Sequence, residues 1–382
     1  MKQPKRLGVL LALTLAFGLV LSACGAKNNN SGASESASAS PAASASASGS
    51  ASASPAADPS VESLKGKKIA LIMQFNQGTF SAQYVDGVKD QVAKYGGEVT
   101  VLASNNDLNT MASNLDTAVN QKFDGILIDH GNADALTAGV NKALAAGIPV
   151  VEFDAGLNID GVTSVAQNDQ VMAEKTLEQL ASDAGGKGNI VKVWVAGFAP
   201  MERRQVAYKA FQEKYPDIKE IAAFGNANNP QLDTQTQMEA ILKQYPKKGD
   251  ITAVWAAWDE FAKGAANAIK QAGRDEIKVY GIDMSDEDLA MIQDPTSPWI
   301  ASAAVDPTTI GRVQVRYLYQ KLHGDKTDAR VELEPIYVSR DALPKDKKVT
   351  TADLSQYVKG WGESDQGNTD YLKQLEQSVA AK

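Results

Sequence analysis

Short apolar runs separated by amphipathic stretches recur along most of the chain after about residue 67. The runs are continuous rather than alternating, which is typical of strands that are buried on both faces. The expected strands are Ile69–Met73, Val99–Leu102, Ile126–Ile128, Ile148–Phe153, Ile190–Val195, Ile221–Phe224, Ala253–Ala257 and Val279–Ile282.

The stretches between these runs have the spacing of amphipathic helices. Phe80, Tyr84, Val88 and Val92 recur every four residues, which places them on one face of a helix. Helices that alternate with buried strands predict parallel sheets built from βαβ units. About 315 residues follow Lys67, which is too many for one compact core. We therefore expect an α/β fold with two doubly wound parallel-sheet domains.

The N-terminus has a different pattern. Lys2, Lys5 and Arg6 precede an uncharged apolar run from Leu7 to Ala23, and this order is typical of an export signal. The run is shorter than the ~20 residues that a membrane-spanning helix usually needs. A transmembrane anchor is the alternative interpretation.

The single cysteine of the chain, Cys24, directly follows Leu21-Ser22-Ala23. This segment resembles the lipobox of bacterial lipoproteins, which implies that Cys24 becomes the new N-terminus and carries lipid such as palmitate. We therefore predict a lipoprotein signal peptide over residues 1–23 and a lipid anchor at Cys24. The protein would then lie on the extracytoplasmic face of the cell membrane, with no cysteine left for a disulfide.

A stretch rich in Ser and Ala follows the cysteine. Of the 27 residues from 31 to 57, 22 are Ser or Ala, and none is an apolar residue larger than Ala. Such a segment cannot build a core. We predict a disordered tether over residues 24–65, which lets the folded part extend away from the membrane surface. A flexible coil of the length of residues 31–57 spans roughly 30 Å.

Polar and aromatic residues follow several of the expected strands. They are Asp129, Asp154, Trp258-Asp259, Asp283 and the segment Phe75–Phe80. Ligands of open parallel sheets bind beyond the carboxyl ends of the strands. An Asp in this position is also a common helix N-cap, so each residue alone has a second explanation. Their repetition in both expected domains favours a binding site.

Four parts of the chain have a recognisable order and spacing. They are Lys68–Met73 with Phe75–Phe80, Phe123–Ile128, Ala145–Val151 and Val279–Asp283. Together these segments resemble the ribose-type periplasmic binding proteins, the sugar-capturing subunits of ABC importers. The resemblance runs from about Lys67 to Arg340 and implies a type I fold of two lobes that close on a ligand by hinge rotation. Carried over residue by residue, it implies a pocket of Gln77, Phe80, Asp129, Asp154, Arg204, Trp258 and Asp283.

The chain departs from that family's pattern at three positions. The usual Asp-Arg pair is Asp154-Ala155 here, a Gln contact falls at about Val305, and Trp258 stands where ribose binders have Asn. These changes argue against ribose itself as the cargo. Carboxylates outnumber Arg204 in the implied pocket, so a cationic ligand such as a polyamine is an alternative to a sugar.

Charge and composition exclude other classes of protein. The net charge is −8, and loss of the three cations of the signal peptide makes it −11, which argues against nucleic-acid binding. The acidic segment Asp283–Asp288 suggests a metal cluster, but Ser285 as the N-cap of an acidic first turn explains it more simply. We therefore expect no metal and no cofactor.

We interpret the chain as a solute-binding lipoprotein that delivers a small polar ligand, with sugar as the expected cargo, to an ABC permease in the membrane. We expect a monomer without enzymatic activity. The alternatives are a ligand-sensing module that presents solute to a membrane histidine kinase or chemoreceptor, and an exported enzyme.

The resemblance also sets the expected domain boundaries. The N-terminal lobe covers residues 66–166 plus 306–334, and the C-terminal lobe covers residues 167–305 plus 335–345. A three-crossing hinge joins them near Gln167, Asp306 and Glu334. Residues 346–382 form a C-terminal extension that could either pack on a lobe or remain mobile.

Overall fold

The computed structural model describes residues 59–381, and the strands in this range form two six-stranded sheets. The first sheet contains, in spatial order, β11 (Arg330–Leu333), β5 (Thr163–Gln167), β4 (Val150–Phe153), β3 (Gly125–Asp129), β1 (Lys68–Met73) and β2 (Glu98–Ala103). The second contains β12 (Ile336–Ser339), β10 (Trp299–Ala304), β9 (Lys278–Ile282), β8 (Ala253–Ala256), β6 (Gly188–Val193) and β7 (Ile218–Phe224). Cys24 and the expected tether up to residue 58 lie outside the described residues. The last part of the predicted tether is folded, because Pro59–Glu62 form a helix and Val61 and Leu64 are buried in the core of the N-terminal lobe, so this lobe begins before residue 66.

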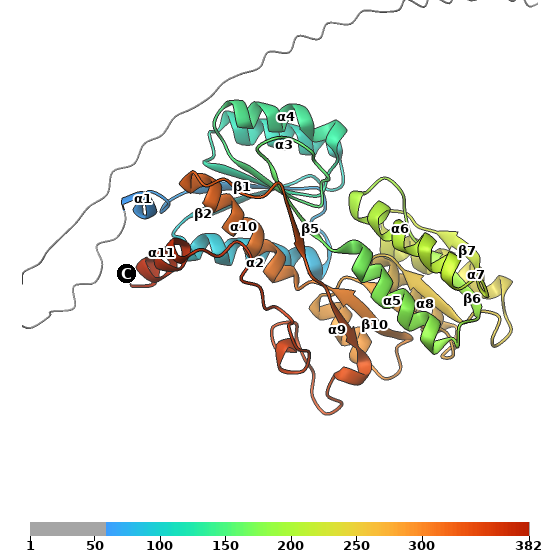
Figure 1. The fold of residues 1–382 in the computed structure, drawn as a ribbon. Helices are drawn as coiled ribbons and strands as arrows, with labels where there is room; N and C mark the ends of the chain where they lie inside the picture. Colours follow the sequence, from blue (N-terminus) through green and yellow to red (C-terminus); the bar gives the residue numbers. More distant parts are fainter. Residues whose placement is uncertain (1–58, 382) are drawn as a thin grey trace, which may run out of the picture. The chain divides into compact units, whose positions relative to one another are not determined.

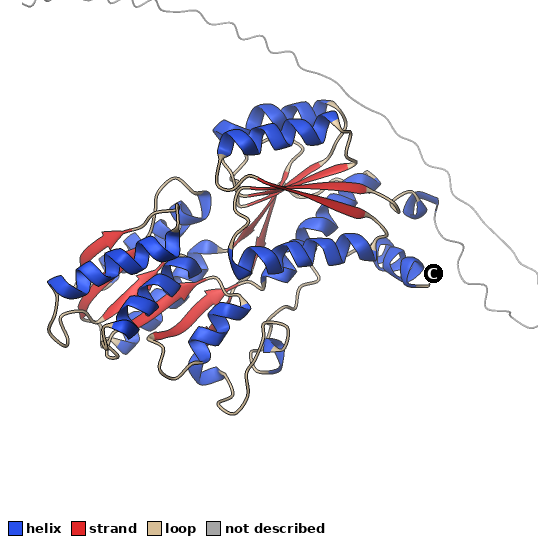
Figure 2. Ribbon diagram, turned by 180° about the vertical axis from the view of Figure 1, so that it is seen from behind, coloured by secondary structure: helices blue, strands red, loops and turns tan. Residues whose placement is uncertain are grey.

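Helices cover both faces of each sheet (Figures 1 and 2). The N-terminal lobe comprises the first sheet with α1 (Pro59–Glu62), α2 (Gly78–Lys94), α3 (Leu108–Asn120), α4 (Ala133–Ala145), α10 (Pro307–His323) and α11 (Asp370–Ala380). The C-terminal lobe comprises the second sheet with α5 (Asp169–Asp183), α6 (Ala199–Lys214), α7 (Pro230–Gln244), α8 (Asp259–Gln271) and α9 (Asp286–Gln293). The expected α/β architecture of two doubly wound sheets is thus confirmed, with β12 antiparallel to β10 as an exception.

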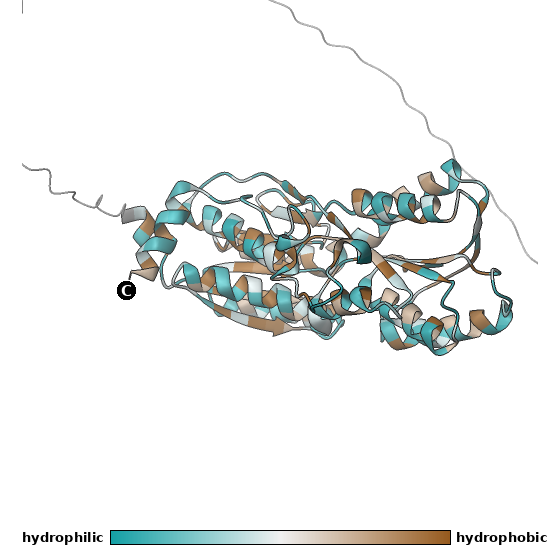
Figure 3. Cartoon of the chain, turned by 90° about the horizontal axis from the view of Figure 1, so that it is seen from below, coloured by the Kyte–Doolittle hydropathy of each residue, from teal (hydrophilic) through white to brown (hydrophobic). Residues whose placement is uncertain are grey.

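The central strand β1 shows why these sheets are covered on both sides. Its alternate residues Ile69 and Leu71 pack with α2 and α10, whereas Ala70 and Ile72 pack with α3 and α4. Figure 3 shows brown apolar positions on the strands and mixed brown and teal faces on the helices. Burial on both faces explains the continuous apolar runs that the sequence shows at these strands.

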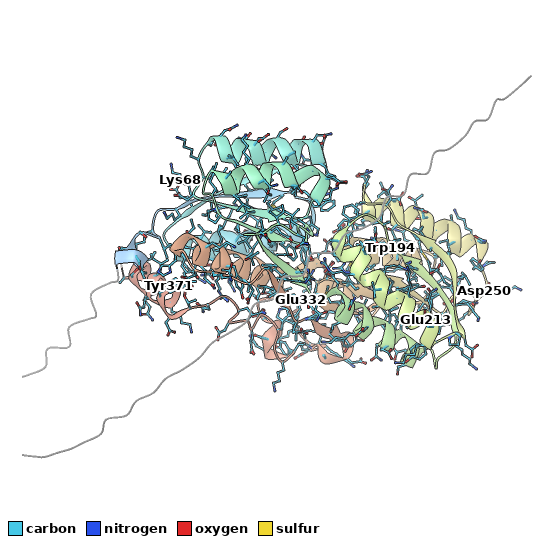
Figure 4. All side chains as sticks on the ribbon, turned by 45° about the horizontal axis from the view of Figure 1, so that its top comes forward. Lys68, Trp194, Glu213, Asp250, Glu332 and Tyr371 are labelled. Atoms are coloured by element: carbon cyan, nitrogen blue, oxygen red, sulfur yellow. The ribbon has the colours of Figure 1, made fainter. Side chains whose placement is uncertain are left out.

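The chain passes between the two sheets at three places within the described residues. It leaves the first sheet after β5, returns between β10 and α10, and crosses again between β11 and β12. Figure 4 labels Glu332 on β11, close to the last of these passages. The pairs β5–β11 and β10–β12 lie next to the crossings, so paired strands flank the connection between the lobes.

Residues of the expected C-terminal extension are packed on both lobes. Trp361 is 2% exposed and belongs to the core of the C-terminal lobe. Leu372 and Leu375 of α11 belong to the core of the N-terminal lobe. Between them, Ser364 and Gly367 accept hydrogen bonds from side chains of α10 at 2.7 Å. The extension therefore forms a further covalent connection between the lobes.

Candidate binding site

A pocket lies between the two lobes, at the carboxyl ends of parallel strands from both sheets. It holds about 740 Å³, counted with the space that opens to solvent. The N-terminal lobe contributes Phe75, Gln77, Phe80, Ser81, Tyr84, Asp129, His130 and Gln167 to its lining. The C-terminal lobe contributes Val195, Phe198, Pro200, Met201, Arg204, Ala227, Trp258, Asp259, Glu260 and Asp283.

The structure brings the residues expected from the sequence close to this pocket. The residues that line it are Gln77, Phe80, Asp129, Arg204, Trp258 and Asp283. Asp154 is not among the lining residues, and it lies behind them, bound to Arg203. Asp154 therefore faces another protein group in this structure rather than the empty space of the pocket.

Asp154 and Asp283 occupy equivalent positions in the two lobes. Each is the first residue after a strand, and each has a left-handed backbone, with φ of 56° and 71°. Their N–H groups donate to the adjacent strand, to Val165 O at 3.1 Å and Ala303 O at 3.0 Å. Non-glycine residues rarely adopt this conformation, and such strain is concentrated at functional sites. The two lobes thus have the same backbone conformation at these strand ends, but only Asp283 lines the pocket, whereas Asp154 binds Arg203.

Arg204 is buried at the pocket and forms hydrogen bonds with three segments of the C-terminal lobe. It is 2% exposed, and its guanidinium donates to Asp283 at 3.2 and 3.3 Å, to Asp169 at 2.8 Å and to the carbonyl of Ala257 at 2.6 Å. Gln167 of the first crossing donates to Asp283 at 3.1 Å from the other side. Burial raises the pKa of Asp283, whereas the charge of Arg204 lowers it.

Arg203 supplies a guanidinium next to Asp154, where the sequence indicated that one was missing. Its Nη2 donates to Asp154, and its Nε donates to Asp169 at 2.7 Å. The side chain of Arg203 is 21% exposed, so it is largely withdrawn from solvent. Burial and the charge of Asp169 raise the pKa of Asp154 to about 7, although Arg203 opposes the shift.

His130 and Asp129 form a second charged pair in the pocket wall. His130 has a left-handed backbone with φ of 57°, and its Nδ1 lies 2.9 Å from Asp129 Oδ1. Burial lowers the pKa of His130, but the charge of Asp129 and the hydrogen bond to it outweigh burial and raise the pKa to about 9. The imidazole is therefore positively charged at neutral pH.

Aromatic rings from both lobes meet at the pocket. The Phe75 ring centroid lies 5.7 Å from that of Trp258, 5.9 Å from Phe198 and 5.6 Å from His130. Trp258 takes the N-cap position of α8, and its indole also packs edge-to-face on Phe261, with ring centroids 5.2 Å apart. Aromatic faces of this kind pack on the apolar face of a sugar ring.

The acidic segment after β9 folds as a capped helix start. Ser285 and Asp288 form a reciprocal capping box at α9. In the described part of the chain no cluster of three His, Cys, Asp or Glu residues is arranged to hold a metal ion. The buried Lys263 instead pairs with acids of α8 and α9, including Glu260 at 2.7 Å and Asp288 at 3.2 Å.

Sequence reasoning missed Arg203 as a site residue and Phe198 as part of the pocket lining. Phe198 is the N-cap of α6 in the loop after β6, so the rule that ligands bind beyond strand ends would have found it. No comparable signal identified Arg203, because its partner Asp154 is in the other lobe.

Comparisons with known proteins agree with this geometry. Residues 69–326 match the profile of the family described as "Periplasmic binding protein domain". The chain belongs to this family, and its relatives include ribose-binding proteins of the type I, sugar-binding group.

The solved structure of a sugar ABC transporter protein from Yersinia enterocolitica is 35% identical and covers 86% of this chain and 100% of its own, with a TM-score of 0.81. A 5-methylthioribose transporter solute-binding protein from Thermotoga lettingae is 33% identical and covers 81% of this chain and 98% of its own, with a TM-score of 0.78. The ribose import binding protein of Bacillus subtilis is 27% identical over 69% of this chain and 84% of its own.

Among the described residues, no helix is both long enough and apolar enough to cross a bilayer.

Proposed function

We propose that the protein is an extracytoplasmic solute-binding lipoprotein that captures a neutral sugar between its lobes and delivers it to an ABC importer. The observation that carries this proposal is the pocket itself, in which aromatic rings and hydrogen-bonding side chains from both lobes converge at the strand ends. A sugar hydroxyl both donates and accepts hydrogen bonds, so it suits adjacent carboxylate, amide and guanidinium groups.

An unused hydrogen-bond acceptor supports a hydroxyl-bearing ligand. Gln167 lines the pocket and is 3% exposed, and its Oε1 has no hydrogen-bond partner in the described part of the protein. A buried acceptor without a donor costs about 1–3 kcal/mol. A ligand hydroxyl that donates to Gln167 would remove this cost, which makes the bound, closed state more favourable than the empty one.

The acids of the pocket lining take part in ion pairs. Each acid of the lining has a cationic partner. The pairs are Asp129 with His130 at 2.9 Å, Asp283 with Arg204 at 3.2 Å, and Glu260 and Asp259 with Lys263 at 2.7 and 3.5 Å. Lys263 also contacts Glu287 at 3.1 Å and Asp288 at 3.2 Å, so four carboxylates share this one cation. The preference for a sugar over a polyamine therefore rests on the relatives rather than on the charges of the pocket. The relatives whose names mention sugar, ribose or 5-methylthioribose agree with a sugar-like cargo.

The membrane anchor belongs to the same proposal. Leu21-Ser22-Ala23-Cys24 lies outside the described residues and is supported by the sequence alone. Lipid on Cys24 would hold the binding lobes beside their permease, and the tether would give them reach. We infer that the protein binds without turnover and acts as a monomer.

The experiment that tests the proposed function is a thermal-shift screen of the purified protein against pentoses, hexoses, sugar alcohols, nucleosides and polyamines. A ligand that binds only the folded state raises the melting temperature by mass action. We expect stabilisation by a neutral sugar or sugar alcohol and none by polyamines. Stabilisation by polyamines alone, or by no member of the panel, would contradict the proposal.

A further inference from the structure

A second pocket adjoins the first at the opening between the lobes. It holds about 660 Å³, again counted with the space that opens to solvent. The two pockets share the lining residues Phe75, Gln77, Ala227, Trp258 and Glu260. We call this outer space the mouth pocket. A group attached to a ligand in the inner pocket can therefore extend directly into it.

Amide side chains from both lobes dominate the rest of the mouth pocket. They are Asn76, Asn105 and Asn106 from the N-terminal lobe and Asn228 and Asn229 from the C-terminal lobe. Asn105, Asn106 and Asn229 have left-handed backbones, with φ of 50°, 63° and 51°, a conformation that Asn tolerates well. Backbone geometry thus explains part of this pattern. It does not explain Asn76 or Asn228, whose φ is not positive.

Some of these amides hold the two lobes together at the mouth. Asn106 Nδ2 donates to Asn228 Oδ1 at 2.9 Å across the gap. Gln74 Nε2 donates to Asn106 Oδ1 at 2.8 Å, and its own Oε1 accepts from the N–H of Gly131 at 2.7 Å. Asn106 is therefore fixed by a buried neighbour, and the bond to Asn228 closes one side of the mouth pocket.

The other amides are free to bind a ligand. Within the described residues the side chains of Asn76, Asn105 and Asn229 make none of the hydrogen bonds found in the structure. Each amide offers both donors and an acceptor. Trp258 lines both pockets, so its indole can pack on a ring at the boundary between them.

As formed by residues 59–381, the lining of the mouth pocket contains one carboxylate and no cationic side chain. The carboxylate is Glu260, which lies 2.7 Å from Lys263, a cation that it shares with Asp259, Glu287 and Asp288. A lining of amides and an aromatic ring, without an ammonium or guanidinium group, suits a neutral hydroxyl-bearing group better than a phosphate.

We propose that the mouth pocket is a second subsite, which binds a further glycosyl ring attached to the sugar in the inner pocket. The inference rests on the proposed function and narrows the cargo to a disaccharide or glycoside. Free amides of Asn105 and Asn229 would bind hydroxyls of the outer ring from opposite lobes. The outer ring would thereby help to hold the lobes closed.

The test compares matched pairs of sugars by isothermal titration calorimetry on the purified protein: D-glucose with maltose, D-galactose with melibiose, and D-xylose with xylobiose. We expect at least one disaccharide to bind at least tenfold more tightly than its own monosaccharide. Equal or tighter binding of the monosaccharide in every pair, or no binding by all six sugars, would overturn the inference. The proposed function itself fails only if the wider thermal-shift panel also gives no sugar or sugar-alcohol ligand.

A variant separates the two pockets. Asn105→Gly with Asn229→Gly removes both amides, while glycine keeps the left-handed backbone without strain. We expect this double variant to lose most of the extra affinity for the disaccharide and to bind the monosaccharide as before. Lys122→Gly, at a left-handed position with φ of 57° away from either pocket, is the matched control. An equal loss for both sugars would contradict a separate outer subsite.

Discussion

Arg203 of the C-terminal lobe forms an ion pair with Asp154 of the N-terminal lobe across the cleft. The same guanidinium also contacts Asp169 at 2.6 Å, within its own lobe. Asp154 and Asp169 are both nearly inaccessible to solvent. When the lobes are closed, Arg203 therefore neutralises the buried carboxylate of Asp154.

The first prediction concerns this interlobe pair. Arg203→Gln leaves Asp154 without a cationic partner, and loss of one member of a buried pair costs about 3–5 kcal/mol. We expect urea titration to show that the free energy of unfolding falls by up to that amount. Arg203 also contacts Asp169, and because Arg204 still pairs with Asp169 in the variant, the loss at that carboxylate is smaller. Combining Arg203→Gln with Asp154→Asn removes the unpaired charge and should recover part of the loss. A double variant no more stable than Arg203→Gln would contradict this account.

The second prediction concerns the carboxylate that faces the pocket. Asp283→Asn weakens the bond to Arg204 and removes an acceptor for a ligand hydroxyl. We expect the affinity for the sugar found in the thermal-shift screen to fall at least tenfold, about 1.4 kcal/mol. Asp294→Asn, on the same lobe but outside the pocket lining, should bind normally. Unchanged affinity in Asp283→Asn, measured by calorimetry, would remove Asp283 from the site.

The third prediction concerns pH. The pKa of His130 is raised to about 9 in the folded protein, against about 6.5 in an unfolded chain. Its stabilising contribution is complete below pH 6.5 and is lost as the pH rises through 9, because the folded state binds the extra proton in this window. We expect the free energy of unfolding to fall between these pH values, with a slope approaching about 1.4 kcal/mol per pH unit.

Two variants test the origin of this slope. His130→Gln removes the titrating group, and Asp129→Asn removes the charge that raises its pKa. Chemical denaturation at several pH values should show a flatter profile for both variants. A wild-type slope in both would mean that other groups cause the pH dependence.

The fourth prediction concerns the C-terminal extension. Trp361 is buried in the C-terminal lobe, and its Nε1 donates to the carbonyl of Thr351 at 2.9 Å. Thr351 accepts from Gln83 of α2 at 2.7 Å and donates to Asp286 of α9 at 2.7 Å, so it contacts both lobes. We expect Trp361→Ala to lower the free energy of unfolding by about 3–5 kcal/mol. Trp361→Phe should cost clearly less, and a loss below about 1 kcal/mol for Trp361→Ala would show that the extension is dispensable.

The sequence predicted the repeating strands and helices well where burial is complete on both faces. The runs at β1, β3 and β9 are continuous and apolar, so their position follows directly from hydrophobicity. The sequence did not reveal β5, β10, β11 or β12. These strands lie next to the crossings and include Thr, Ser, Gln, Arg and Glu, so they lack a continuous apolar run. They can be identified only from their pairing with a neighbouring strand.

The candidate site could be predicted where the chemistry follows a strand end. Asp129 and Asp283 were found in this way, and Gln77, Phe80 and Arg204 came from the resemblance. The partner of Asp154 could not be found, because Arg203 approaches it from the other lobe. A contact such as Arg203 with Asp154 forms only when the two lobes approach each other. The residues on either side of each position in the sequence give no sign of that approach. The mouth pocket was missed for the same reason.

The central claim is that a neutral sugar binds between the lobes at the ends of their parallel strands. The most direct measurement is a crystal structure of the protein with the sugar or sugar alcohol that gives the largest thermal shift. We expect its density between the two lobes, with a ring against Trp258 and hydroxyls within hydrogen-bonding distance of Gln167 and Asp283. Density for the ligand on another surface, with this pocket empty at saturating concentration, would contradict the account.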